Sequence, residues 1–267
     1  MKIQDFPHSQ DDWQLAVLTD PHLFRDPDAC LLGVPTQASF DACLEAMDGD
    51  GGRQDCLLLT GDLAQDHNPE TYRRLGRQLA ARPEPWFWIP GNHDDASAMV
   101  EELGAPVRCL KGRHWQLVLL HSQVPGKTFG ELGEEELALL EACLADDSRH
   151  TLVVLHHHPL SLDSRWLDQH ILHDGQALLA RLARHDKACA VLFGHVHQEV
   201  DSMVQGVRLL ATPATCVQFQ AGSQDFALAE LGPGYRRLCL KADGTIATTV
   251  HRLPAERFPV DASAGGY

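Results

Sequence analysis

The chain has 267 residues, a length within the range of one large domain, and 44% of them are apolar, as in an ordinary soluble globular protein. Its formal net charge of −15 argues against a broad electrostatic surface for nucleic acid or for an anionic membrane. Because no apolar run approaches membrane-spanning length and the N-terminus lacks the apolar stretch of a secretory signal, we expect a cytoplasmic protein with neither nucleic acid nor a membrane as partner.

Short apolar runs alternate with stretches of helical periodicity through most of the chain, a pattern typical of βα units. Asn68 and Pro69 predict an N-cap and the first position of a helix. Leu137, Leu140 and Leu144 mark one face of a later amphipathic helix. The predicted strands of this region are residues 15–19, 56–60, 86–89, 117–121, 152–155 and 190–193. The predicted helices are residues 37–47, a segment from Pro69 onward, and residues 96–103, 134–145 and about 178–182.

From residue 199 onward the pattern changes to strands and turns. The predicted strands here are residues 207–211, 226–231, 236–240 and 245–251. An Ala-Asp-Gly sequence at residues 242–244 suggests a hairpin turn between the last two. With no internal repeat and no long linker, we predict an α/β sandwich in a single domain. That domain comprises a motif-bearing βα part at about 14–197, a mainly β part at about 199–252 and a tail at 253–267 within residues 1–267.

Five polar motifs stand where predicted strands end, which is the usual place for a site in an α/β sheet. In the first, Asp20 and His22 are two residues apart, so on an extended chain they point the same way and can hold one metal. In the second, Asp62 has two carboxylate oxygens that can bridge two cations, and Gly61 allows a sharp turn beside it. Taken alone, each motif is explained as well by ordinary turn chemistry.

The third motif, at residues 91–94, contains Asn92 and His93. An asparagine oxygen is a neutral ligand for a hard or borderline metal, and the adjacent His93 would then be free to meet a substrate. An asparagine-capped helix start is the alternative interpretation of this motif. The motif is moderately specific.

Histidines form the last two motifs. The run at residues 156–158 follows a buried strand, and three consecutive histidines cannot all face an apolar core without partners. At least one of them therefore binds something. His195 and His197 follow the strand at 190–193 and share a side. A single histidine is usually structural, whereas a pair at a strand end is better evidence of a site.

One explanation serves all five motifs. Oxygen and imidazole ligands suit Mn, Fe or Zn better than Ca or a copper site. No cysteine belongs to the set, which argues against a structural zinc site, and the eight cysteines are scattered and read as free thiols in a reducing cytoplasm. Bound cations would also give this negative protein the local positive charge that a phosphate needs.

The ordered motifs, over residues 20–197, resemble those of the calcineurin-like metallophosphoesterases. The resemblance implies a four-layer α/β/β/α sandwich with mixed sheets. It also implies two divalent metal ions per chain, Fe, Mn or Zn with Fe and Mn favoured, bridged by Asp62 and a water or hydroxide. The first ion would be held by Asp20, His22, Asp62 and His197. The second would be held by Asp62, Asn92, His156 and His195, with His157 as the alternative to His156 in this run of three histidines.

Longer stretches look like the bacterial class III 3′,5′-cyclic AMP phosphodiesterases. These stretches are residues 156–160, 166–170, 194–199 and 211–219. The resemblance implies a cyclic-nucleotide substrate, cleaved to 5′-AMP by attack of the metal-bridging hydroxide, with Asn92 and His93 as the catalytic residues. Asn92 would orient the phosphate, and His93 would serve the departing 3′ oxygen as acid. The substrate would contact His22, Asp62, Asn92, His93 and His197.

Base recognition stays open at this point, because Trp166, His170 and Phe219 could flank an adenine or could serve the core or the surface. Two other functions also stay open. A metallophosphoesterase acting on another phosphodiester, a nucleotide sugar or a phosphomonoester would share the same metal ligands. A non-enzymatic binding scaffold would lack some ligands, whereas every motif position is filled here. The sequence predicts neither the oligomeric state nor the native metal pair.

Overall fold

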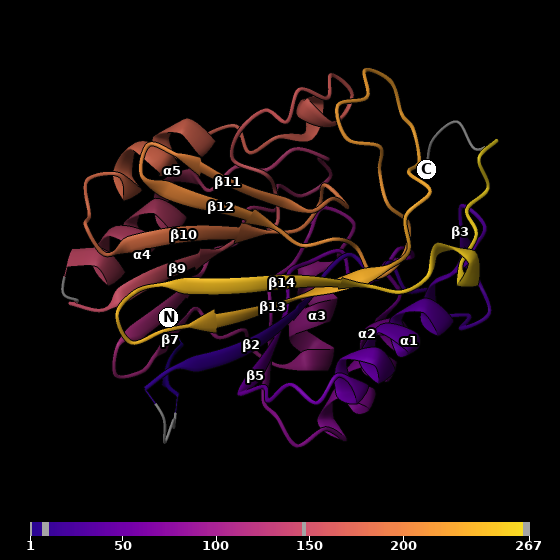
Figure 1. The fold of residues 1–267 in the computed structure, drawn as a ribbon, viewed down its shortest axis with the longest axis horizontal. Coiled ribbons are helices and arrows are strands. Elements are labelled where there is room, and N and C mark those ends of the chain that lie inside the picture. The colour runs from indigo at the N-terminus through magenta and orange to yellow at the C-terminus, as the bar shows by residue number, and fades with distance from the viewer. Residues whose placement is uncertain (1, 7–10, 146–147, 264–267) are drawn as a thin grey trace.

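The computed structural model describes residues 2–6, 11–145 and 148–263, and it contains two mixed β-sheets that pack face to face (Figure 1). The seven strands of the larger sheet are, in spatial order, β1 (Ile3–Asp5), β7 (Cys109–Lys111), β8 (Trp115–Leu119), β9 (His150–Val154), β10 (Ala188–Phe193), β12 (Val207–Ala211) and β11 (Val200–Val204). The five strands of the smaller sheet are, in spatial order, β14 (Ile246–Arg252), β13 (Gly234–Leu240), β2 (Trp13–Leu18), β5 (Cys56–Leu59) and β6 (Trp86–Trp88). A separate ribbon pairs β3 (Cys30–Leu31) with β4 (Val34–Pro35).

Helices cover the two outer faces of this pair of sheets (Figure 1). The smaller sheet is covered by α1 (Thr36–Gly49), α2 (Pro69–Ala80) and α3 (Ala96–Leu103). The larger sheet is covered by α4 (Gly133–Ala145) and α5 (Gly175–Leu182). The order of layers is therefore α/β/β/α, which confirms the predicted sandwich. No helix in the described ranges combines the length and the apolar character that crossing a membrane requires.

Strand β2 shows how the sequence builds this core. Successive side chains of a strand point to opposite faces of its sheet. Leu15 and Val17 pack into the layer between the two sheets, whereas Ala16 and Leu18 pack against the helices on the other side. Because both faces of the sheet are covered, the strand is an apolar run rather than an alternating one.

The parallel strands bring the polar motifs together. In the smaller sheet β2, β5 and β6 run parallel, and in the larger sheet β9 and β10 run parallel. Parallel neighbours end at the same edge of a sheet, so the segments that follow these five strands meet where the carboxyl edges of the two sheets adjoin. These are the segments that carry the five motifs.

The predicted elements are largely confirmed, with shifts of at most three residues at their ends. Asn68 caps α2, since its side chain accepts a hydrogen bond from the backbone N–H of Glu70 at 3.0 Å. The predicted hairpin turn joins β13 to β14, and Gly244 adopts a φ of 92° there.

One predicted strand, at residues 226–231, is wrong. Only Leu228 pairs within it, in a single bridge to Phe219, and Phe226 packs against other aromatic rings. The alternating apolar side chains of this segment pack a loop against its neighbours and do not belong to a β-sheet strand. The pattern does not predict β1, β3, β4, β7 and β11 individually, because short or exposed strands carry little apolar pattern.

The segment after β14 returns to the ribbon of β3 and β4. Phe258 is buried, and the backbone N–H of Asp261 donates to the carbonyl of Leu32 at 2.8 Å. Residues 264–267 of the predicted tail lie outside the described ranges. The single-domain organisation stays a prediction, which the apolar layer shared by both sheets supports.

Candidate metal centre

The side chains named from the sequence come together at the adjoining edges of the two sheets. Asp20 and His22 follow β2, Asp62 follows β5, and Asn92 and His93 follow β6, all in the smaller sheet. From the larger sheet, His156 follows β9, and His195 and His197 follow β10. Four overlapping groups of three have ligand atoms within 4.8 Å of one another. They are Asp20, His22 and His197; Asp20, Asp62 and His156; His22, Asp62 and His93; and His156, His157 and His195.

The local backbone is bent where extended chain was expected. Five of the candidate ligands have φ between 46° and 67°, in the left-handed region that non-glycine residues adopt rarely. Ligand atoms of Asp20 and His22 lie within 4.8 Å of one another although the backbone is left-handed there. The extended chain from which the pairing was argued is therefore wrong, and the pairing at a metal stays a prediction. Backbone strain of this kind costs of order 1–3 kcal/mol per residue and clusters at functional sites. The five residues are Asp20, His22, Asp62, His195 and His197.

The backbone at Gly91 approaches Asp62 so closely that only a glycine fits there. A Cβ atom at Gly91 would lie 2.2 Å from Oδ1 of Asp62, which no side chain tolerates. The same Oδ1 accepts a hydrogen bond from the backbone N–H of His93 at 2.8 Å. One oxygen of Asp62 is thus held by the loop that follows β6, and the other oxygen is left to face the centre.

Oδ2 of Asp62 lies between two groups of buried imidazoles. It is 3.7 Å from Nε2 of His22 on one side and 3.3 Å from Nε2 of His156 on the other. Beyond His22 lies Nε2 of His197, at 3.2 Å, which in turn is 3.4 Å from Oδ1 of Asp20. This shared position supports the bridging role of Asp62, which stays a prediction.

The second group joins Asp62 to the loop after β6. Nε2 of His156 lies 3.2 Å from Oδ1 of Asn92. His195 lies with its ring centroid 5.0 Å from that of His156, and its Nε2 is buried with no hydrogen-bond partner among the described residues. An orphaned buried nitrogen is costly, so this atom fits a bound ligand such as a metal ion.

Hydrogen bonds on the far side of three imidazoles determine which nitrogen faces the centre. Nδ1 of His156 donates to the carbonyl of Thr60 at 2.8 Å, and Nδ1 of His197 donates to the carbonyl of Val217 at 2.9 Å. Nδ1 of His22 lies 2.6 Å from the amide oxygen of Gln65 and donates to it. With Nδ1 protonated, a neutral imidazole presents the lone pair of Nε2, as metal-binding histidines do.

This arrangement tests whether the residues fit a metal. Nε2 of His22 and Nε2 of His197 are 3.2 Å apart. When Nδ1 of each ring holds the proton, both Nε2 atoms carry an unshared lone pair. Two lone pairs this close repel each other unless a cation lies nearby. Buried carboxylates beside them would favour that cation, so the donor set fits a divalent metal on each side of Asp62.

The titration of the group agrees with this fit. Burial raises the pKa of Asp62, but the imidazoles of His156 and His93 outweigh it and hold the pKa well below its usual range. Burial lowers the pKa of His22 to about 3, so this imidazole is neutral. Burial would also lower the pKa of His156, but Asp62 outweighs it and raises that pKa to about 9. Without a cation, a proton therefore occupies the position between Asp62 and His156, and metal binding would release it.

The three consecutive histidines face different partners. His156 is the one that reaches Asp62 and Asn92. His157 instead has Nδ1 at 2.7 Å from the hydroxyl of Ser122, and Nε2 of His158 lies 3.5 Å from Asp168. The geometry thus supports His156 over His157 as the ligand beside Asp62, and that assignment stays a prediction.

Two residues that the sequence reasoning did not select hold the loops of the site. The side-chain nitrogen of Gln123 donates to the carbonyls of Gly91 at 2.7 Å and Asp94 at 2.5 Å, on both sides of Asn92. The hydroxyl of Tyr72 donates to the buried carboxylate of Asp94 at 3.1 Å. Gln123 comes shortly after β8, so a search for polar residues behind each strand would have found it. Tyr72 lies on the apolar face of α2, and its sequence context gives no sign of this role.

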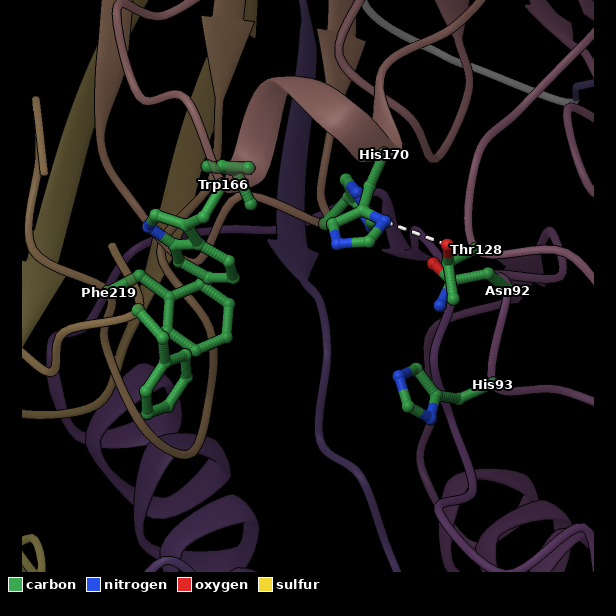
Figure 2. A pocket seen from close by; sticks show the side chains of 9 residues that line it. Asn92, His93, Thr128, Trp166, His170 and Phe219 are labelled. Carbon is green, nitrogen blue, oxygen red and sulfur yellow. Dashed lines mark hydrogen bonds between the residues drawn. The ribbon is translucent and has the colours of Figure 1, made fainter. Parts of the chain in front are cut away.

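A cavity of about 250 Å³ opens beside Asn92 and His195. Figure 2 shows His93, Asn92 and Thr128 on one side of it and Trp166 and Phe219 on the other, with His170 between them. Its further lining residues are Leu167 and Phe226. The cavity gives a small molecule access to the candidate metal centre.

A sequence model of the family described as calcineurin-like phosphoesterases matches residues 14–199. The chain belongs to this family. It is 46% identical over 253 residues to the 3′,5′-cyclic adenosine monophosphate phosphodiesterase CpdA of Haemophilus influenzae, with 92% of each chain covered. It is 44% identical over 256 residues to the protein of the same name from Escherichia coli K12, with 94% of this chain and 93% of that one covered.

Similarity to solved structures supports the fold. A dimetal phosphatase from Danio rerio superposes with a TM-score of 0.60 at 13% sequence identity, covering 88% of this chain and 98% of that one. A purple acid phosphatase from yellow lupin superposes with a TM-score of 0.59 at 12% identity, covering 91% of this chain and 54% of that one. At such identities the likeness concerns the architecture alone. Together with the ligand groups, the family implies bound divalent metals.

Proposed function

We propose that this protein is a binuclear-metal phosphodiesterase that hydrolyses 3′,5′-cyclic AMP to 5′-AMP. The observation that carries the proposal is the position of Asp62 Oδ2 between the imidazoles of His22 and His156. The choice of substrate is supported by relatives of 38–46% identity that are named cyclic AMP phosphodiesterases and align over nearly the whole chain. A cytoplasmic location and the absence of nucleic-acid and membrane partners remain predictions.

The proposed ligands form two sets that share Asp62. Oxygen and imidazole donors without thiolate favour Fe or Mn, with Zn also compatible. The first set consists of Asp20, His22, Asp62 and His197. The second set consists of Asp62, Asn92, His156 and His195.

Two divalent cations, when bound, supply an activated water and neutralise charge on a phosphoryl group. The protein contributes position and proton transfer. Asn92 directs its amide oxygen toward His156, which leaves the amide N–H groups to hold a phosphate oxygen. His93 is half-buried, lines the cavity next to Asn92, and has its ring 5.0 Å from that of His22. This position supports the proposed role of His93 as the acid that protonates the departing 3′ oxygen of the ribose.

The experiment that tests this function is a substrate comparison on the metal-loaded protein. Cyclic AMP, cyclic GMP, glycerophosphodiesters and nucleotide sugars are assayed side by side, and chromatography separates 5′-AMP from 3′-AMP. We expect cyclic AMP to be the best substrate and 5′-AMP its product. No turnover of cyclic AMP with Mn, Fe or Zn, together with turnover of another ester, would assign the site to that other phosphoesterase reaction.

A further inference from the structure

Three aromatic side chains form one wall of the cavity beside the proposed metal centre. We refer to Trp166, Phe219 and Phe226 as the aromatic corner. Their ring centroids are 4.9 Å apart for Trp166 and Phe219, 5.3 Å for Trp166 and Phe226, and 5.8 Å for the two phenylalanines. Interplanar angles of 84°, 73° and 67° make each contact edge-to-face, an arrangement that aromatic rings favour. The rings thus hold one another in place without a ligand.

Two loops that are far apart in sequence build this corner. Trp166 immediately precedes the short 3₁₀ helix Leu167–His170, whereas both phenylalanines come from the segment between β12 and β13. The hydroxyl of Ser164 donates to the carbonyl of Ser223 at 2.7 Å, which ties one loop to the other. A wall that is preformed in this way loses little conformational entropy when a ligand binds.

The aromatic corner is joined directly to the proposed metal centre. The ring of Phe219 stacks on that of His197, with centroids 4.2 Å apart and planes 14° apart. His170 lies between the two sides of the cavity, with its ring centroid 6.3 Å from that of His195 and 6.5 Å from that of Trp166. One small molecule can therefore reach both the metal ligands and the corner (Figure 2).

The chemistry of the lining distinguishes the two ends of such a molecule. Asn92, His93 and His195 line the end of the cavity next to the proposed metal centre, and aromatic and aliphatic side chains line its far end. No lysine, arginine or carboxylate occurs among the lining residues of this cavity in the described part of the chain. The far end consequently suits a flat, uncharged group and not a second phosphate.

His170 adds a hydrogen-bonding group at the edge of the corner. Its Nδ1 lies 2.7 Å from the hydroxyl of Thr128, and within the described ranges its Nε2 has no hydrogen-bond partner. A threonine hydroxyl rotates to donate or to accept, so the imidazole can present Nε2 either as an acceptor or as a donor. The edge of a purine carries both kinds of group.

We propose that this cavity binds the purine base of the nucleotide, with the ring against the aromatic corner and its edge at His170. The inference rests on the proposed function for the position of the phosphate at the metal ligands. Trp166 is the residue expected to matter most, because it contacts both other rings of the corner and has the largest face.

Calorimetry on the metal-loaded protein tests the inference without requiring turnover. Titrations compare 5′-AMP with ribose 5-phosphate, which carries a phosphate and a sugar but no base. The matched variants are Trp166→Phe and Trp166→Leu, which fill similar volumes but differ in the presence of an aromatic face. Stacking of a base on an aromatic side chain is worth about 1–3 kcal/mol, or roughly 5- to 150-fold in Kd.

We expect wild-type protein to bind 5′-AMP more tightly than ribose 5-phosphate. Trp166→Leu should raise the Kd for 5′-AMP by roughly 5- to 150-fold and leave the Kd for ribose 5-phosphate within about twofold of the wild-type value. Trp166→Phe should retain most of the wild-type affinity for 5′-AMP. Equal affinities of the two ligands in the wild type, or equal weakening of both by Trp166→Leu, would overturn the base site. If this contrast holds but cyclic AMP is not hydrolysed, the base site stands and the proposed function fails.

Discussion

The carboxylate of Asp94 accepts a hydrogen bond from the backbone N–H of Leu63 at 2.9 Å, which joins two loops that lie 31 residues apart in sequence. The same carboxylate accepts the N–H groups of Ala64 at 3.0 Å and Gly91 at 2.9 Å. The first loop carries Asp62 and the second carries Asn92. Asp94 is thus a shared acceptor that holds two proposed metal ligands in a common position.

Replacing Asp94 by Asn should lower both stability and metal content. One amide oxygen cannot replace two carboxylate oxygens, and the amide N–H groups would face backbone N–H groups, so buried donors lose their acceptor. We expect the free energy of unfolding to fall by about 2–4 kcal/mol, measured by denaturant titration. Tyr72→Phe is the control, because it removes one bond to the same carboxylate together with the acceptor of the Asp95 N–H, and it should cost about 1–2 kcal/mol. Equal costs for the two variants would contradict the shared-acceptor role.

Removing the metals should abolish hydrolysis. The carboxylates of the site and most of its imidazoles are proposed as metal ligands, so we expect the attacking group to be a water that the cations activate. We expect dialysis against a strong chelator to eliminate turnover and Mn²⁺ or Fe²⁺ to restore it, with circular dichroism as the check that the fold persists. Full activity in protein that elemental analysis finds free of metal would refute the two-metal assignment.

Loss of Asp62 should reduce metal content more than loss of a terminal ligand. Its carboxylate belongs to both proposed sets and separates two cations that otherwise repel each other. The comparison is metal stoichiometry by elemental analysis in Asp62→Ala, His22→Ala and His195→Ala. If the Asp62 variant keeps two metals per chain, the bridging role is wrong.

The effect of His93→Ala should depend on the leaving group. A ribose 3′ alkoxide is a strong base that needs a proton, whereas a nitrophenolate does not. We expect kcat on cyclic AMP to fall by roughly 10²–10⁴-fold, and by much less on bis(p-nitrophenyl) phosphate, with metal content near that of wild type. Equal losses on both substrates would mean that His93 stabilises the phosphoryl group itself, and loss of metal would make it a ligand.

Far from the site, the contact between Asp50 and Arg237 should give stability a measurable dependence on pH. Burial raises the pKa of Asp50, but two hydrogen bonds from the guanidinium, at 2.7 and 2.6 Å, outweigh it and lower the pKa to about 2 from the ordinary 3.8. Since the folded pKa is depressed, the stabilisation is present above pH 3.8 and is lost as pH falls toward 2. Asp50→Asn should cost roughly 1 kcal/mol at pH 7, because a partly exposed pair is screened.

The measurement is the difference in unfolding free energy between wild type and Asp50→Asn at several pH values. That difference should shrink as the pH falls below 4. Asp48→Asn, which loses a more exposed pair with Arg82, is the control and should change stability little at any pH. A difference for Asp50→Asn that does not change with pH would show that the carboxylate charge is not the cause.

Much of the fold and of the candidate site was predictable from local pattern. Apolar runs identified the strands on which the motifs depend, and a cap identified the start of α2, because periodicity and end residues are encoded within a few positions. The side chains named at the strand ends are those that the structure brings together. The prediction of a strand at 226–231 was wrong because it also rested on local pattern, and local alternation does not reveal which surface an apolar face will cover.

Contacts between distant residues needed the tertiary structure. Nε2 of His22 and Nε2 of His197 come within 3.2 Å although the residues are 175 positions apart, and they follow strands of different sheets. Three further features depend on how the sheets and loops dock. They are the position of His156, and not His157, next to Asp62, the left-handed backbone at the proposed ligands, and the packing of Phe226 into the aromatic corner. Residue types and their order are written in the chain, whereas these distances arise only when the burial of the core brings two sheet edges together.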